Sequence, residues 1–287
     1  AALHEPDSAL CRIDADLDVE NEQERVTDEV HTGDVDACHL ALSPSGAWAA
    51  VAHYTSGSVS VFGTGAHGGG VRLVDTVTLV GASGVDIARQ EAPHAHHTVW
   101  LSDSLLLVCD LGADVIRQFR WRPSTLEEVE PIVLPPGFGP RHLVVRRTGK
   151  LTEIAVVGEL SGEVASFSSP HPGVEGWLSC DRIAGSLVGG SAPSAIRLLS
   201  DRQIVLANRF INTLSFIDWA EHGSLTLVDE IDSGGEHARD LVVHDGRLWI
   251  AHQHSDEITV LEQASSGWRI IERIPVLRPA ALCFVTG

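Results

Sequence analysis

The sequence predicts an all-β chain built from repeated four-stranded antiparallel sheets, and three observations support this fold class. A pattern of three short apolar runs separated by turns occurs five times. The runs are rich in Val, Leu, Ile and Phe and end at Gly, Ser, Asp or Pro, as strands and hairpins do. The copies are 58, 45, 53 and 45 residues apart, counted from Cys38, His96, Arg141, Ser194 and Arg239. Four-stranded sheets at this period close radially into a β-propeller.

The elements are expected in the following order. Residues 1–37 predict the rear strands of one blade. Five complete blades follow, at 38–95, 96–140, 141–193, 194–238 and 239–278. Residues 279–285 predict a single inner strand, and we expect an N-terminal segment to supply the other strands of that last blade. The total is seven blades, with six as the alternative, and residues 1–287 are expected to form a single domain.

The composition excludes several classes of function. The net charge is -19, which disfavours binding to nucleic-acid phosphates and to anionic membranes. No apolar stretch approaches the roughly 20 residues that a membrane helix needs. The five cysteines are far apart and mostly within apolar runs, which predicts reduced thiols and a cytoplasmic protein.

Two positions of each repeat carry the polar residues. We call the residue before the first run the entry position; it is Cys38, His96, Arg141, Ser194 or Arg239. We call the two residues that end the second run the exit pair; the pairs are 53–54, 110–111, 158–159, 208–209 and 252–253. The first strand of each propeller blade lines the central channel, so we expect these positions to gather at one mouth. A register error of one residue would turn the side chains away.

The arginines at these positions suggest an anion site. Arg141, Arg209 and Arg239 are each more often structural when taken singly, as partners of a carboxylate between blades. Three of them converging in a strongly acidic chain would instead favour a fork for carboxylate or phosphate. Glu159 has two interpretations: a carboxylate neutralised by Arg141 or Arg209, or a group that shares proton transfer.

The segment ProHisAlaHisHis (93–97) contains the candidate acid or base. His94 and His96 are expected on one strand face, which raises a metal site as an alternative, but no third ligand is evident. A hydrogen-bonded structural histidine is a second alternative, and a general base or acid at His96 is the third.

Other acidic residues predict structural roles. Asp110 and Asp114 are expected to shape a turn within a blade. The acidic segment 14–24 lacks the glycine of a calcium loop and predicts a solvated loop. The chain has no Walker loop, nucleophile elbow or dinucleotide fingerprint.

Taken together, these motifs resemble those of the seven-bladed lactonase propellers, which include bacterial 6-phosphogluconolactonases and fungal carboxymuconate cyclases. The matching segments follow the family order and cover most of residues 5–285: CysHisLeuAlaLeuSerProSerGly (38–46), HisTyrThrSerGlySerValSerValPhe (53–62), ProHisAlaHis (93–96), AspLeuGlyAlaAsp (110–114), GlyProArgHis (139–142), GlyGluLeuSer (158–161), AsnArg (208–209) and ArgAsp (239–240). Two departures bear on substrate choice. His53-Tyr54 stands where the family usually has AsnTyr, and His97 stands where Ser is common.

The resemblance implies a lactonase that acts on an anionic sugar lactone, with 6-phosphogluconolactone as the first candidate. It implies site residues His96, Arg141, Glu159 and Arg209, with no cofactor and no metal. We add Arg239 and His142 as substrate-binding residues, and expect His96 and Glu159 to be catalytic. The alternatives are a carboxymuconate lactonizing enzyme, which would use the same arginines, and a propeller that only binds partners. The oligomeric state is left open.

Overall fold

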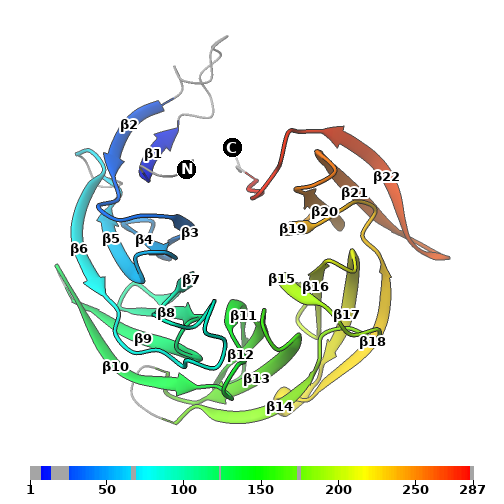
Figure 1. Ribbon diagram of the computed structural model, residues 1–287, viewed down its shortest axis with the longest axis horizontal. Coiled ribbons are helices and arrows are strands. Elements are labelled where there is room, and N and C mark those ends of the chain that lie inside the picture. The colour runs from blue at the N-terminus through cyan, green and yellow to red at the C-terminus, as the bar shows by residue number, and fades with distance from the viewer. Residues whose placement is uncertain (1–7, 14–25, 66–68, 123, 173–175, 285–287) are drawn as a thin grey trace. The chain divides into compact units, whose positions relative to one another are not determined.

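The computed structural model describes residues 8–13, 26–65, 69–122, 124–172 and 176–284. Within them, the strands form five four-stranded antiparallel sheets and one two-stranded sheet (Figure 1). The predicted all-β class of four-stranded antiparallel sheets is confirmed. The chain divides into two compact units, residues 1–140 and residues 141–286. No helix in the described ranges has the length and apolar character needed to cross a membrane.

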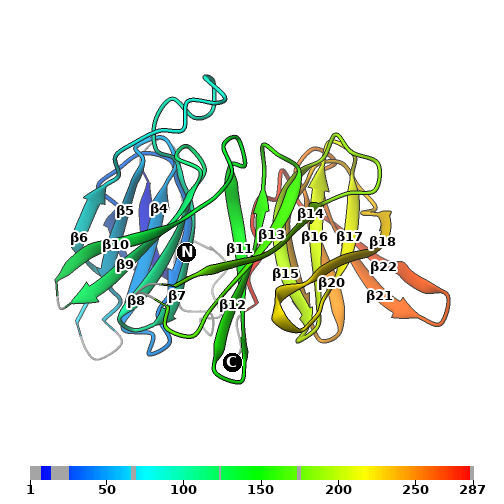
Figure 2. The ribbon, with the colours of Figure 1, turned by 90° about the horizontal axis from the view of Figure 1, so that it is seen from below.

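The first unit contains three sheets. The two-stranded sheet is β1 (Ala9–Ile13) and β2 (Val26–His31). The next sheet has β3 (Ala37–Leu42), β4 (Trp48–His53), β5 (Ser58–Gly63) and β6 (Arg72–Thr78). The third has β7 (Ala95–Ser102), β8 (Leu105–Asp110), β9 (Val115–Arg122) and β10 (Thr125–Val133). The loop between β6 and β7, drawn in cyan, extends beyond the strand ends (Figure 2).

The second unit contains three more four-stranded sheets. The first has β11 (Pro140–Thr148), β12 (Leu151–Gly158), β13 (Glu163–Ser169) and β14 (Leu178–Ala184). The second has β15 (Ala192–Ser200), β16 (Gln203–Arg209), β17 (Thr213–Trp219) and β18 (Leu225–Asp232), with a short 3₁₀ helix, η2 (Glu221–Gly223), before β18. The third has β19 (Ala238–His244), β20 (Arg247–His252), β21 (Glu257–Ala264) and β22 (Gly267–Pro275).

The five predicted blades agree with the five four-stranded sheets, and β1 pairs antiparallel with β2 where the rear of another blade is predicted. The predicted inner strand at 279–285 is wrong for the described residues 279–284, which form no strand. The backbone N–H of Leu282 donates to the Asp240 carboxylate at 2.8 Å instead of to a neighbouring strand. The Phe284 ring then stacks on His244, with ring centroids 3.8 Å apart.

The core lies between adjacent sheets of each unit. The second and third strands of the sheets are buried along nearly their whole length, as in β4 and β5. Both of their faces are covered, so they are apolar at consecutive positions rather than at alternate ones. The fourth strands β6 and β22 are largely exposed on at least one face. Sheets built in this way bury the middle of each blade and leave the strand ends free to carry the site.

Local turn chemistry sets the hairpins. Asp245 and Gly246 join β19 to β20 with φ of 49° and 70°, the left-handed pair that a tight type I′ hairpin requires. At the β3–β4 turn, the Gly46 N–H donates to the Ser43 carbonyl at 2.8 Å, and Gly46 has a φ of 71°. Glycine adopts this conformation without a steric cost.

Candidate active site

Four of the five entry positions, Cys38, His96, Ser194 and Arg239, lie on β-bulges. In three sheets the pairing register between the first and second strands skips one residue, and the skipped residues are Cys38, His96 and Arg239. In the sheet of β15 the register skips Ser194 together with Ala195. A bulge bends the strand and re-aims the extra side chain, and bulges are frequent next to active sites. The side chains that differ from one repeat to the next therefore stand where the hydrogen bonding between the first and second strands is interrupted.

The first residue of an exit pair has a structural role, because it binds a side chain of the neighbouring strand. Four of these residues are buried and polar, and each has a side-chain partner: His53, Asp110, Asn208 and His252. Their partners on the third strand of the same sheet are, in that order, Ser58, Arg117, Ser215 and Thr259. Burial lowers the pKa of His252 to about 4, although the nearby Glu257 acts in the opposite direction. These residues anchor the ends of the second strands and so fix the direction of the residue that follows each of them.

The second residue of two exit pairs joins a buried ion network in the second unit. Glu159 follows β12, and its Oε2 lies 2.7 Å from Arg141 Nε and 2.7 Å from Arg209 Nη2. Arg141 also donates to the backbone carbonyl of Ser194, and Arg209 Nε donates to that of Ala192 at 3.3 Å. The side chains of Arg141, Glu159 and Arg209 are 2%, 5% and 7% exposed. One carboxylate therefore holds two guanidinium groups in place.

An imidazole lies beside this network. The His237 ring stacks on His254, with centroids 4.1 Å apart, and meets the edge of Phe210 at 5.7 Å. Arg209 contacts the same Phe210 ring, with its guanidinium carbon 5.8 Å from the centroid. The His237 backbone N–H donates to Asn212 Oδ1 at 2.8 Å. The ring is thus held at the strand ends next to Arg209.

The electrostatic environment of His237 is positive. Its pKa is lowered to about 4, first by burial and then by the charged groups around it, which are His254, Arg209, Arg239 and Arg141. The three predicted arginines therefore act on one imidazole. This is a local positive field in a chain of net charge -19.

In the first unit, the residues around His96 form an aromatic cluster. Tyr54 stacks on His94 at 4.4 Å and meets His96 edge-on at 5.8 Å. His94 has a protein contact on each ring nitrogen, Nδ1 to the Tyr54 carbonyl at 2.9 Å and Nε2 to Glu91 at 3.2 Å. Arg89 Nε donates to the Tyr54 hydroxyl at 3.1 Å. His96 is 6% exposed.

The structure places the predicted residues as follows. Arg141, Glu159, Arg209 and Arg239 are in the second unit around His237, whereas His96 is in the first unit. His142 directly follows Arg141 on β11 and is 7% exposed. The Glu159 carboxylate binds both arginines, which favours the interpretation of an orienting and neutralising group. The described residues contain no group of three or more His, Cys, Asp or Glu suited to a metal.

The other sequence predictions fare differently. Asp114 shapes a turn as expected: its carboxylate accepts hydrogen bonds from the backbone N–H groups of Gly137 and Gly139 and from the Gln90 side chain. Asp110 binds Arg117 at 2.8 Å. None of the five cysteines, all of which lie in the described ranges, is in a disulfide. The predicted solvated loop at 14–24 lies outside the described residues.

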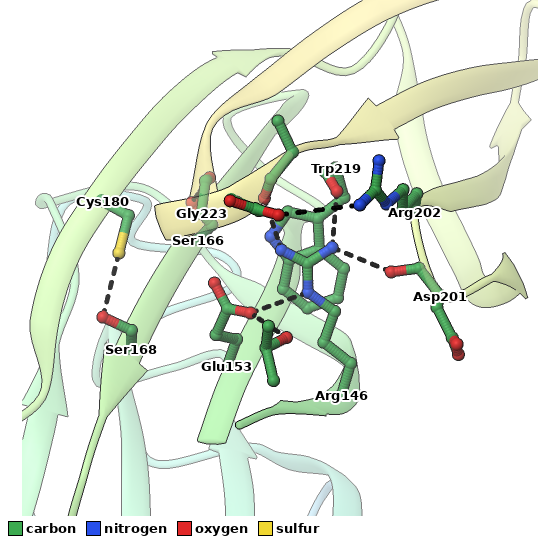
Figure 3. Close-up of polar contacts among 12 residues, drawn as sticks. Arg146, Glu153, Ser166, Ser168, Cys180, Asp201, Arg202, Trp219 and Gly223 are labelled. Atoms are coloured by element: carbon green, nitrogen blue, oxygen red, sulfur yellow. Dashed lines mark hydrogen bonds and ion pairs between the residues drawn. The ribbon is translucent and has the colours of Figure 1, made fainter. Parts of the chain in front are cut away.

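A cleft of ≈ 480 Å³ lies at the other end of β11. It is lined by Arg146, Arg147, Arg202, Trp219 and Glu221 among others. Figure 3 shows that Arg146 binds Glu153, at 2.9 Å, and lies over Trp219, with its guanidinium carbon 4.0 Å from the ring centroid. It also donates to the carbonyls of Asp201 and Trp219. These contacts give Arg146 a structural role between two sheets, about 17 Å along the strand from Arg141 at about 3.3 Å per residue.

Sequence reasoning missed His237, His254 and Phe210. The repeat contains a signal for the first of them. GluHisAlaArg (236–239) and ProHisAlaHis (93–96) have the same histidine two residues before the entry position. Phe210 has a φ of 69°, which is rare for a bulky residue and marks a strained turn.

Comparison with known proteins agrees with this architecture. The model of the family described as "Lactonase, 7-bladed beta-propeller" matches residues 11–268. A 6-phosphogluconolactonase of Formosa agariphila is 28% identical over 238 residues, which cover 78% of this chain and 66% of that protein. An uncharacterized protein of Staphylococcus saprophyticus is 29% identical over 228 residues, which cover 76% of this chain and 64% of that protein. The chain thus spans less than two thirds of the length of these relatives.

A solved structure gives the same result at the level of the fold. The periplasmic gluconolactonase of Pseudomonas aeruginosa superimposes with a TM-score of 0.78 at 26% identity, over 91% of this chain and 76% of that one. Because the family model covers most of the sequence and the sheets have the matching form, this chain belongs to the seven-bladed β-propeller lactonase family.

Proposed function

We propose that this protein hydrolyses an anionic sugar lactone, with 6-phosphogluconolactone as the first substrate to test. The observation that carries the proposal is the group of three arginines that act on His237 beside the Glu159 carboxylate. Membership of the lactonase family supports lactone chemistry, and the Formosa agariphila relative is named for this substrate.

The charges in the second unit favour an anion. Arg141, Arg209 and Arg239 contribute three positive charges, and Glu159 offsets one of them. The buried Glu159 contacts also restrict the directions of two guanidinium forks, which suits recognition of the planar or tetrahedral oxygens of a carboxylate or phosphate.

Hydrolysis requires two contributions from the protein. A base takes a proton from the attacking water, and positive donors stabilise the oxygen that becomes negative when the water adds to the carbonyl carbon. The arginines supply the second contribution. Glu159 positions them, so it acts through Arg141 and Arg209 rather than on the lactone itself. The base is His96 in the sequence-based prediction. The absence of a cofactor and a cytoplasmic location also remain predictions.

The test is hydrolysis of fresh 6-phosphogluconolactone by the pure protein, with Arg141→Lys and Arg202→Ala beside it. Arg141→Lys keeps the charge but loses the fork, and removal of one such donor lowers kcat by about 10²–10³-fold. Arg202, whose side chain is 81% exposed, lines the separate cleft, so its replacement is expected to leave the rate unchanged. A wild-type rate no faster than spontaneous hydrolysis would reject this substrate.

A second outcome would also reject the proposal. If Arg141→Lys folds, as judged by its thermal unfolding, and hydrolyses the lactone as fast as the wild type, the arginine group is not the anion site. The equal loss of activity in Arg202→Ala and Arg141→Lys would move the site to the cleft beside Arg146.

A further inference from the structure

His237 is held in the second unit by contacts on its backbone and on its ring. Its N–H donates to Asn212 Oδ1 at 2.8 Å, and its carbonyl accepts the Gln253 N–H at 3.1 Å. Its φ of 58° turns the chain sharply just before β19 begins at Ala238. The ring is stacked on His254 on one side and meets the Phe210 edge. These contacts leave the imidazole few orientations.

We propose that His237 is the general base that activates the attacking water in lactone hydrolysis. This inference rests on the proposed function and names the proton acceptor of the same arginine site. His237 stands two residues before Arg239, and the Phe210 ring contacts both His237 and Arg209, so the imidazole lies near these two arginines. A water held there would lie between a proton acceptor and the groups that stabilise the oxyanion.

Two other histidines near the strand ends, His94 and His252, are less suited to this role. His94 has both ring nitrogens engaged, by the Tyr54 carbonyl and by Glu91. His252, the first residue of its exit pair, is fully buried and is bound to Thr259 at 2.8 Å. His237, in contrast, is half-buried, so that a water and a lactone can reach its edge while its stacked face stays covered.

The proposed step balances as follows. One proton of the water moves to the neutral His237 ring while the water oxygen forms a bond to the lactone carbonyl carbon. The π electron pair of the carbonyl moves onto its oxygen, which the arginines stabilise. Collapse of this intermediate breaks the bond between the carbonyl carbon and the ring oxygen, and the imidazolium returns the proton to that ring oxygen. The product is a hydroxy acid, which releases one proton to the solvent.

The charged surroundings suit an imidazole that must be neutral before it reacts. The groups that face His237 are His254, Arg209, Arg239 and Arg141, with Glu159 bound to two of these arginines and Glu236 adjacent in the chain. Burial first, and then His254 and the arginines, lower the pKa of the ring, so it is neutral at neutral pH. An anionic substrate bound among them offsets their charge and raises the pKa of the ring towards its usual value near ~6.5, where it is a stronger base.

The test compares His237→Asn with His222→Asn. Asn tolerates a positive φ and is polar but accepts no proton at neutral pH, so His237→Asn keeps the turn and removes the base. His222 is a matched control, because it is also a histidine at positive φ (63°) in the same unit, but it is exposed in η2. Rates with 6-phosphogluconolactone are measured from pH 4 to pH 8 and expressed as the ratio of wild type to variant, which cancels the ionisation of the substrate.

The expected result is a loss of about 10²–10⁴-fold in kcat for His237→Asn, with KM nearly unchanged, and full activity for His222→Asn. The pKa read from the acid limb of the wild-type kcat/KM profile should lie well below the ~6.5 of an ordinary histidine. This acid limb should disappear in His237→Asn. Added imidazole should restore part of the rate.

Two results would overturn the inference separately from the proposed function. A wild type that hydrolyses the lactone, with His237→Asn within about threefold of it, leaves the lactonase proposal standing and removes His237 as the base. A large loss in His96→Asn with none in His237→Asn gives the role to His96. A wild type without activity rejects the lactonase proposal and this role together.

Discussion

Replacement of Glu159 by Gln removes the one carboxylate that lies between two buried arginines. Its Oε2 is 2.7 Å from Arg141 Nε and 2.7 Å from Arg209 Nη2, so these two nitrogens are at most about 5.4 Å apart. Without the carboxylate, two positive charges at that distance repel by about 3 kcal/mol at an effective dielectric constant of about 20. Loss of one partner from a buried pair costs about 3–5 kcal/mol in other proteins. We expect Glu159→Gln to lower the free energy of unfolding by about 3 kcal/mol.

Urea unfolding followed by circular dichroism measures this loss, and Glu153→Gln is the matched control. Glu153 is also buried and binds one arginine, Arg146, at 2.9 Å. Both variants should be destabilised, but only Glu159→Gln frees guanidinium groups at the proposed anion site. Phosphate should therefore raise the unfolding midpoint of Glu159→Gln more than that of the wild type, and should not do so for Glu153→Gln.

The reasoning about Glu159 is refuted if Glu159→Gln is as stable as the wild type, because the three side chains would then not form a buried charge network. It is also refuted if phosphate stabilises both glutamine variants equally, since the anion would then not be bound by Arg141 and Arg209.

Two further predictions concern the fold. The pKa of His252 is lowered to about 4, so the unfolded chain binds a proton there first as the pH falls. The neutral His252 stabilises the fold fully above pH ~6.5, and about 3 kcal/mol of this stabilisation is lost as the pH falls from ~6.5 to about 4. A His252→Gln variant should therefore show a smaller difference in urea midpoint between pH 7 and pH 4 than the wild type. In Gly112→Ala the new Cβ would lie 1.8 Å from the Ala92 carbonyl oxygen, which predicts a loss of about 1–3 kcal/mol or failure to fold. Gly63→Ala, with no atom closer than 3.6 Å, is the control, and an equally stable Gly112→Ala would contradict the packing.

The repeat could be recognised from sequence because its signals are local. Apolar runs of strand length, turns such as AspGly at 245–246, and a constant period are encoded in adjacent residues. The blade boundaries follow from them. The wrong strand at 279–285 had the same local signal, but the Asp240 side chain takes the Leu282 N–H, and a strand needs a partner that local sequence does not specify.

The candidate site was accessible from sequence only in part. The entry positions and exit pairs selected Arg141, Glu159, Arg209 and Arg239, because polar residues at fixed places in an apolar repeat stand out. A carboxylate neutralised by Arg141 or Arg209 was one of two interpretations of Glu159, but its binding to both was not accessible, since these contacts join residues 18 and 50 positions apart, counted from 141 to 159 and from 159 to 209. Bulges that change the register by one residue decide which way such side chains point.

For this protein, the sequence by itself determined the strands, the blades and the residue types at the strand ends, because these depend on patterns within a few neighbouring residues. Only the tertiary structure decided that Glu159 is shared by two arginines and that His237 lies in their field. The physical reason is that charge interactions depend on distance in space. That distance is set by how whole sheets pack and where their registers shift, which no single segment encodes.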